Sequence, residues 1–100
     1  MNTRDAGDAL FSESALLRGA REGNQEALKE LVARHHSSAF RVALGMLGDE
    51  ADAQDVVQDG MLRALKGLSG FRGDASFRTW LLAIVANEAR SMLRRRTRQR

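Results

Sequence analysis

The chain has 100 residues, 43% of them hydrophobic and 29% charged, a composition typical of one small globular domain and not of a disordered segment. It has no Cys, so disulfides and thiolate metal sites are excluded. The first ten residues contain no secretory signal, and no apolar run approaches the roughly 20 residues that cross a bilayer, so membrane spans are excluded. A cytoplasmic location is therefore expected. Residues 1–62 carry 6 basic and 11 acidic residues (net −5) and residues 63–100 carry 10 basic and 2 acidic (net +8), which predicts a polyanionic partner for the second part and a basic or polar protein surface for the first.

The spacing of apolar residues predicts four helices and no sheet. After a loose leader (residues 1–11), apolar residues recur at intervals of three and four over residues 13–22, 25–47, 50–67 and 77–96. A small polar residue precedes each helix, where its side chain can accept hydrogen bonds from the first turn. These predicted N-caps are Ser12, Asn24, Asp49 and Ser76. We therefore expect an all-α fold, a compact bundle of three long helices plus a short N-terminal helix.

The apolar positions of the last two helices define most of the expected core. In the helix over 50–67 they are Ala53, Val56, Val57, Gly60, Met61, Ala64 and Leu65, continued by Leu68. In the helix over 77–96 they are Phe77, Trp80, Leu81, Ile84, Ala89 and Leu93. Between these helices lies a glycine-bearing loop over residues 69–75.

A second stripe runs along the outer face of the helix over 50–67. Asp55, Gln58, Asp59 and Leu62 follow the same three-and-four spacing. Acidic residues around an exposed leucine suit the docking of a basic or amphipathic helix. The alternative is a solvated face with one incidental leucine.

The loop and the last helix combine aromatic and basic residues. Phe71 lies in the loop near Arg72 and Arg78, and rings interleaved with guanidinium groups suit single-stranded DNA, whose bases stack and whose phosphates attract positive charge. Asn87 and Arg90 share one helix face, and bidentate contacts to bases favour adenine for Asn and guanine for Arg. The alternative is that the rings are core residues, which we expect for Phe77 and Trp80 but less for Phe71.

The C-terminal segment from Arg94 to Arg100 has five arginines in seven residues and is expected to fray while reaching phosphates, although a solubilising basic tail would look the same. Adjacent His35 and His36 point about 100° apart on a helix and cannot share a metal ion from one face. No nucleophile–base pair or phosphate loop is recognisable. We therefore expect no enzymatic activity, cofactor or metal.

Two motifs resemble region 2 of bacterial sigma factors of the extracytoplasmic-function (ECF) type. Gly48-Asp49 followed by Asp52-Ala53-Gln54-Asp55-Val56-Val57-Gln58-Asp59 resembles the polymerase-binding helix of that family. Phe71-Arg72-Gly73-Asp74 and Phe77-Arg78-Thr79-Trp80-Leu81, followed by Ile84 and Asn87, resemble its next loop and helix. The likeness covers about residues 14–97. It implies a region 2 domain over 12–97 and a basic tail over 98–100, without the second domain that reads the −35 element.

The resemblance also implies roles for both surfaces. Asp55, Gln58, Asp59 and Leu62 would bind the clamp-helix coiled coil in the largest subunit of core RNA polymerase. Arg63 and the loop from Phe71 to Ser76 would surround a base flipped out of the non-template strand of the promoter −10 element, and Asn87 and Arg90 would face the upstream end of that element. The expected DNA-binding residues are Arg63, Phe71, Arg72, Gly73, Asp74, Ser76, Arg78, Asn87, Arg90, Arg94 and Arg95.

These roles imply a non-enzymatic specificity subunit that docks on core polymerase and recognises and melts the −10 element. Base capture would share with polymerase the unstacking cost, a few kcal/mol per base. One alternative is a sigma-like module that acts mainly as the target of an anti-sigma factor, which is an expected partner in either case. The other is a generic basic helical DNA-binding protein without polymerase contact.

Overall fold

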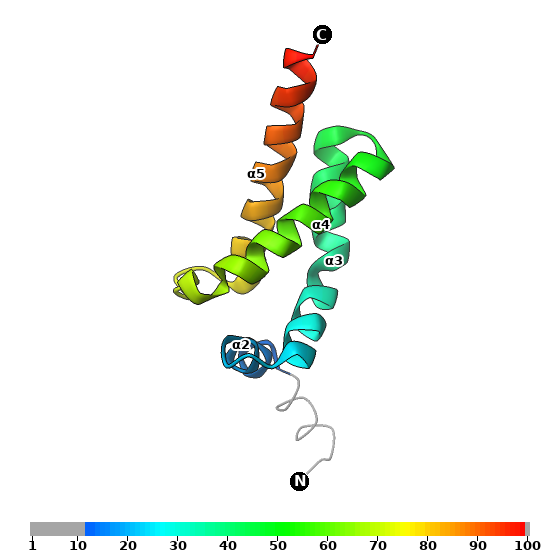
Figure 1. Cartoon of the computed structure of the whole chain (residues 1–100). Coiled ribbons are helices and arrows are strands. Elements are labelled where there is room, and N and C mark those ends of the chain that lie inside the picture. Colours follow the sequence, from blue (N-terminus) through cyan, green and yellow to red (C-terminus); the bar gives the residue numbers. More distant parts are fainter. Residues whose placement is uncertain (1–11, 100) are drawn as a thin grey trace. The chain divides into compact units, whose positions relative to one another are not determined.

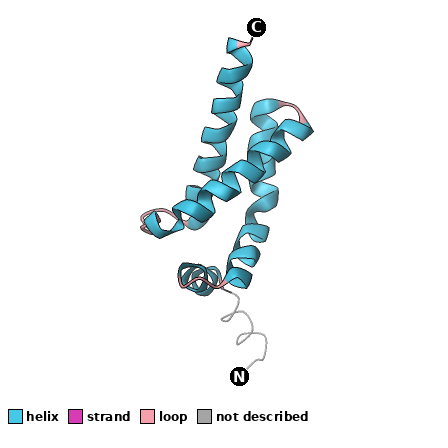
Figure 2. Ribbon diagram, viewed as in Figure 1, coloured by secondary structure: helices cyan, strands magenta, loops and turns pink. Residues whose placement is uncertain are grey.

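The structure, a computed structural model, describes residues 12–99, and within that range the chain is helical with no strand (Figure 2). The elements are α2 (Glu13–Arg21), α3 (Gln25–Leu47), α4 (Glu50–Gly67), a 3-10 turn η1 (Leu68–Gly70) and α5 (Phe77–Arg98) (Figure 1). This confirms the all-α fold with three long helices and one short one. The leader predicted over residues 1–11 lies outside the described residues. In the described part of the chain, no helix is long and apolar enough to span a membrane.

All four predicted N-caps are confirmed by side-chain hydrogen bonds. Each cap oxygen accepts from a backbone N–H two or three residues further on, which satisfies donors that the first turn of a helix leaves unpaired. The bonds are Ala15 N to Ser12 Oγ (3.2 Å), Glu26 N and Ala27 N to Asn24 Oδ1 (3.0 and 3.1 Å), Asp52 N to Asp49 Oδ1 (2.9 Å) and Thr79 N to Ser76 Oγ (3.1 Å). Helix starts therefore follow from local sequence.

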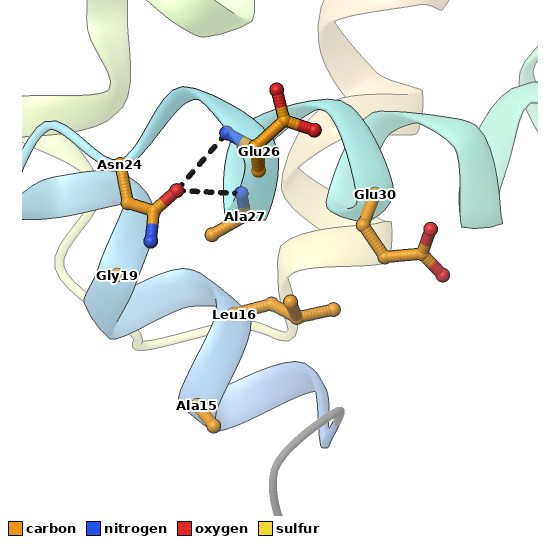
Figure 3. A pocket seen from close by; sticks show the side chains of 7 residues that line it. All are labelled: Ala15, Leu16, Gly19, Asn24, Glu26, Ala27 and Glu30. Carbon is orange, nitrogen blue, oxygen red and sulfur yellow. Dashed lines mark hydrogen bonds between the residues drawn. The ribbon is translucent and has the colours of Figure 1, made fainter.

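The chain divides into two compact units, one ending at Arg34 and one beginning at His35. In the first unit a tight turn joins α2 to the start of α3. Gly23 adopts a positive φ of 93°, and Asn24 N donates to the Gly19 carbonyl oxygen at 2.8 Å. A Cβ at Gly19 would lie 3.1 Å from Ala27 Cβ, so the two helices approach closely beside the Asn24 cap (Figure 3). The predicted break between the helices over 13–22 and 25–47, with Asn24 as the N-cap of the second, is confirmed.

In the second unit α4 packs against α5, and their closest approach is at Gly60. A Cβ at Gly60 would lie 2.9 Å from Val85 Cγ2 and 3.3 Å from Val85 Cα. The predicted inner face of α4 is confirmed, because it is buried throughout except at the half-buried Leu65. A glycine at this position lets the two helix backbones approach closely.

The core face of α5 differs from the prediction. The buried residues are four apart: Phe77, Leu81, Val85 and Ala89. Val85, which was not predicted, is fully buried against Gly60, whereas Trp80, Ile84 and Leu93 are only half-buried. An apolar stripe wider than one row does not show which of its rows faces the partner helix, and the space at Gly60 selects the row that contains Val85.

Within the second unit, the part of α3 from His35 onward and α5 run in the same direction, with α4 as the return connection (Figure 1). At their starts the His35 and Phe77 ring centroids lie 5.6 Å apart. At their ends Arg96 Nη1 donates to the Leu47 carbonyl oxygen at 3.3 Å, and Arg96 Nη2 pairs with Asp52 Oδ2.

These contacts of Arg96 correct the prediction that the chain frays from Arg94. The guanidinium satisfies a carbonyl that the end of α3 leaves unpaired and pairs with a carboxylate in the first turn of α4. The helix continues to Arg98. Arg96 is held by the protein, so it differs from the other arginines that were expected to reach phosphates.

Candidate docking face and nucleic-acid interface

The docking face of α4 consists of Asp55, Gln58, Asp59 and Leu62, all exposed as the sequence predicts. Leu62 is 49% exposed and is the large apolar side chain that stands out to solvent among the described residues. Within residues 12–99, Asp55, Gln58 and Asp59 form no side-chain hydrogen bond or ion pair. Their acceptors are therefore available to donors of a partner, and Leu62 offers apolar area among them.

Arg63 lies at the border between the docking face and α5. Its Nε forms an ion pair with Glu88 Oε1, and the carboxylate side chain is only 13% exposed whereas the Arg63 side chain is 69% exposed. Asp59, Leu62, Arg63, Lys66 and Glu88 together line a hollow of about 400 Å³. The structure therefore places Arg63 next to Glu88 in the middle of α5, and Glu88 directly follows Asn87 in the sequence.

The loop between η1 and α5 forms a second hollow, of about 240 Å³. Gly73, with a positive φ of 84°, turns the backbone there. The lining residues are Gly70, Phe71, Arg72, Gly73, Asp74, Ala75 and Trp80. Four of the predicted DNA-binding residues therefore meet in one place, and Trp80 joins them. Arg63, Ser76 and Arg78 do not line this loop hollow: Ser76 caps α5, and Arg78 Nη2 donates to Ser38 Oγ at 3.5 Å.

The expectation that Phe71 is less well explained as a core residue than the other rings is wrong. Its side chain is 6% exposed, and its ring centroid lies 5.1 Å from that of Trp80 and 6.1 Å from that of Phe77. Aromatic pairs at such distances stabilise a fold beyond the area they bury. Phe71 thus anchors the loop to α5, while half-buried Trp80 is the larger ring at the loop hollow.

The outward face of α5 carries a polar stripe of Asn87, Arg90, Ser91 and Arg94 at helical spacing. Arg90 Nη2 donates to Asn87 Oδ1, and Arg94 Nη2 donates to Ser91 Oγ at 3.0 Å. Arg95 and Arg98 are exposed beyond them. Sequence reasoning identified Asn87 and Arg90 but missed Ser91, whose place at i+4 from Asn87 was the available signal.

No group of three His, Asp or Glu side chains within residues 12–99 is placed to hold a metal ion. The chemistry that these surfaces offer is binding: acceptors and one leucine on α4, and donors, rings and positive charge on the loop and α5.

Comparison with known proteins identifies the family of this chain. Residues 31–99 match the family model described as Sigma-70 region 2. The chain is 39% identical over 100 residues to the RNA polymerase sigma factor CnrH of Cupriavidus metallidurans, covering 99% of this chain and 49% of that protein. It is 38% identical over 84 residues to the ECF RNA polymerase sigma factor SigM of Mycobacterium tuberculosis, covering 84% of this chain and 43% of that protein.

A solved structure is also similar: the NMR structure of an engineered region 2 of sigmaE in complex with GTAAAA. The TM-score is 0.81 at 27% identity, covering 88% of this chain and 92% of the other. The chain spans about half the length of the curated relatives it matches. With more than half of its residues matched by the family model and with these relatives, the chain belongs to the sigma-70 region 2 family and is a region 2 domain of an ECF sigma factor.

Proposed function

We propose that this sigma factor domain binds core RNA polymerase through the docking face and recognises and melts the promoter −10 element through the loop hollow and the α5 stripe. It acts by binding and does not catalyse a reaction. The observation that carries the proposal is that one unit of the chain presents two chemically opposite surfaces, an acidic face with an exposed leucine on α4 and a basic, ring-bearing surface on the loop and α5.

Docking on polymerase is supported by the exposure of Asp55, Gln58, Asp59 and Leu62 without partners within residues 12–99. Carboxylates accept strong, charge-assisted hydrogen bonds from Arg and Lys, and an apolar side chain at the centre of such a patch supplies area that water leaves on binding. A basic or amphipathic helix has the chemistry this face requires, and the family resemblance assigns that role to the clamp-helix coiled coil of the largest subunit. Residues facing solvent contribute little to folding, so the face is free to serve binding.

Capture of unpaired bases is supported by the loop hollow, where Trp80 offers an aromatic surface beside Arg72 and a backbone turn at Gly73. Stacking of a base on an aromatic ring contributes roughly 1–3 kcal/mol, which offsets a large part of the free energy needed to unstack the base from its DNA neighbours. One similar protein of known structure is an engineered region 2 of sigmaE in complex with GTAAAA. By similarity, we assign single-stranded −10 DNA as the ligand of this surface.

The test is a pull-down of bacterial core RNA polymerase by the purified chain, with and without a single-stranded −10 oligonucleotide, combined with fluorescence anisotropy of the same oligonucleotide against a scrambled one. We expect polymerase binding, and a preference for the −10 sequence that strengthens when polymerase is present. DNA binding without polymerase binding would instead support a generic basic DNA-binding protein. Polymerase binding without any sequence preference would contradict the −10 role and leave docking alone.

A further inference from the structure

The amide of Asn87 is held in one orientation by its neighbour on α5. Arg90 Nη2 donates to Asn87 Oδ1. A guanidinium group has donors only, so the oxygen of the amide, and not its nitrogen, faces Arg90. Both side chains are exposed, and within residues 12–99 the amide nitrogen has no acceptor. Within this range the NH₂ group of Asn87 therefore has no partner, whereas one of the two acceptor sites of its oxygen is taken by Arg90.

The same arrangement recurs one turn further along α5. Arg94 Nη2 donates to Ser91 Oγ at 3.0 Å, which occupies an acceptor site of the hydroxyl and leaves its O–H to donate. Asn87, Arg90, Ser91 and Arg94 follow one another on the same helix face. The α5 stripe thus presents donors outward, because its two side-chain oxygens are already engaged by arginines of the stripe itself.

We infer that Arg90 is a specificity-determining residue: by occupying the Asn87 oxygen, it makes the α5 stripe select guanine over adenine at the −10 position that Asn87 contacts. This rests on the proposed function, since it assumes that the stripe meets unpaired or groove-exposed base edges. Asn87 alone would favour adenine, because its oxygen accepts from adenine N6 while its nitrogen donates to N7. The contact with Arg90 uses one of the two acceptor sites of this oxygen and orients the oxygen toward the guanidinium group, which weakens the first half of that pairing.

Base chemistry then decides the preference. Guanine presents two acceptors, N7 and O6, on the edge where adenine and cytosine each present a donor. The Asn87 NH₂ group and a remaining N–H of Arg90 match both guanine acceptors, whereas the adenine and cytosine amino groups would face donors. Thymine offers one acceptor, O4, so we expect its affinity to lie between that of guanine and those of adenine and cytosine. Because the residues are exposed, we expect about fivefold discrimination between guanine and adenine, the low end for a bidentate pair.

The experiment uses fluorescence anisotropy with a labelled single-stranded oligonucleotide containing GTAAAA and all of its single-base variants, measured for wild type, Arg90→Met, Arg95→Met and the double variant Asn87→Ala/Arg90→Met. Arg90→Met frees the Asn87 oxygen and keeps most of the side-chain length. Arg95→Met is the matched control, because it removes one positive charge from the same helix and leaves the Asn87–Arg90 contact in place. Circular dichroism confirms that each variant is folded.

We expect one position at which wild type binds guanine about fivefold tighter than adenine and Arg90→Met binds adenine at least as tightly as guanine. Arg95→Met should weaken binding to all variants alike, and the double variant should lose the adenine preference gained by Arg90→Met. The inference is overturned if Arg90→Met and Arg95→Met change the base preferences equally, or if wild type prefers adenine wherever Asn87 matters. Absence of binding to every oligonucleotide would overturn the proposed DNA-binding function as well, so the two failures are distinguishable.

Discussion

Substituting Gly60 by Ala tests the contact that positions α4 against α5. The new Cβ would lie 2.9 Å from Val85 Cγ2 and 3.3 Å from Val85 Cα, closer than such atoms pack. Val has one strongly preferred rotamer in a helix, and its Cα belongs to the backbone, so the clash requires the helices to move apart. Overpacking of this kind costs about 1–3 kcal/mol. The helix preference for Ala over Gly returns about 1 kcal/mol, so we expect Gly60→Ala to destabilise by up to about 2 kcal/mol.

Gly45→Ala is the matched control. Gly45 also lies within a long helix, with an ordinary φ, and its Cβ would have no neighbour within 4 Å. It should gain only the helix preference, so the two variants should differ by about 1–3 kcal/mol in free energy of unfolding. In a domain of this size that corresponds to at least about 4 °C between their melting temperatures, measured by circular dichroism. Equal melting temperatures would refute the argument that close packing against Val85 requires a glycine at position 60.

Three further predictions address the docking face, the loop and the end of α5. Asp55→Ala combined with Gln58→Ala should weaken polymerase binding in a pull-down while the melting temperature stays near wild type, because neither side chain has a partner within the described chain. Unchanged polymerase binding would contradict the proposed role of the docking face. Phe71→Ala should destabilise by about 3–5 kcal/mol because the ring is buried, and an unchanged melting temperature would show that the ring does not anchor the loop. Arg96→Met should increase amide hydrogen exchange over the last turn of α5 with less than about 1 kcal/mol lost overall, since its partner Asp52 is partly exposed; wild-type exchange rates there would contradict the anchoring role.

Local patterns within single segments were sufficient to predict the helices. Each N-cap depends on a side chain and the backbone of the next few residues, so Ser12, Asn24, Asp49 and Ser76 could be identified without knowledge of the fold. The two faces of α4 were predictable for a similar reason. Apart from exposed Leu62 and half-buried Leu65, its large apolar positions and its polar positions separate at helical spacing, and burial follows that separation.

Contacts between distant segments decided the rest. Phe71 and Trp80 are both apolar rings near one loop, and only the packing of that loop on α5 determines that Phe71 is buried and Trp80 half-buried. The row of α5 that contains Val85 faces the core because Gly60, 25 positions earlier in the sequence, leaves room for the Val85 side chain.

Electrostatic partners depend in the same way on tertiary structure. A run of arginines predicts positive charge at the end of the chain, but it does not distinguish Arg96, which the end of α3 and the start of α4 hold, from exposed Arg95. The sequence likewise does not show that Arg63 forms an ion pair with Glu88. Helix spacing determines which face of its own helix a side chain occupies, whereas its partners depend on where the other helices lie, which only the packed chain determines.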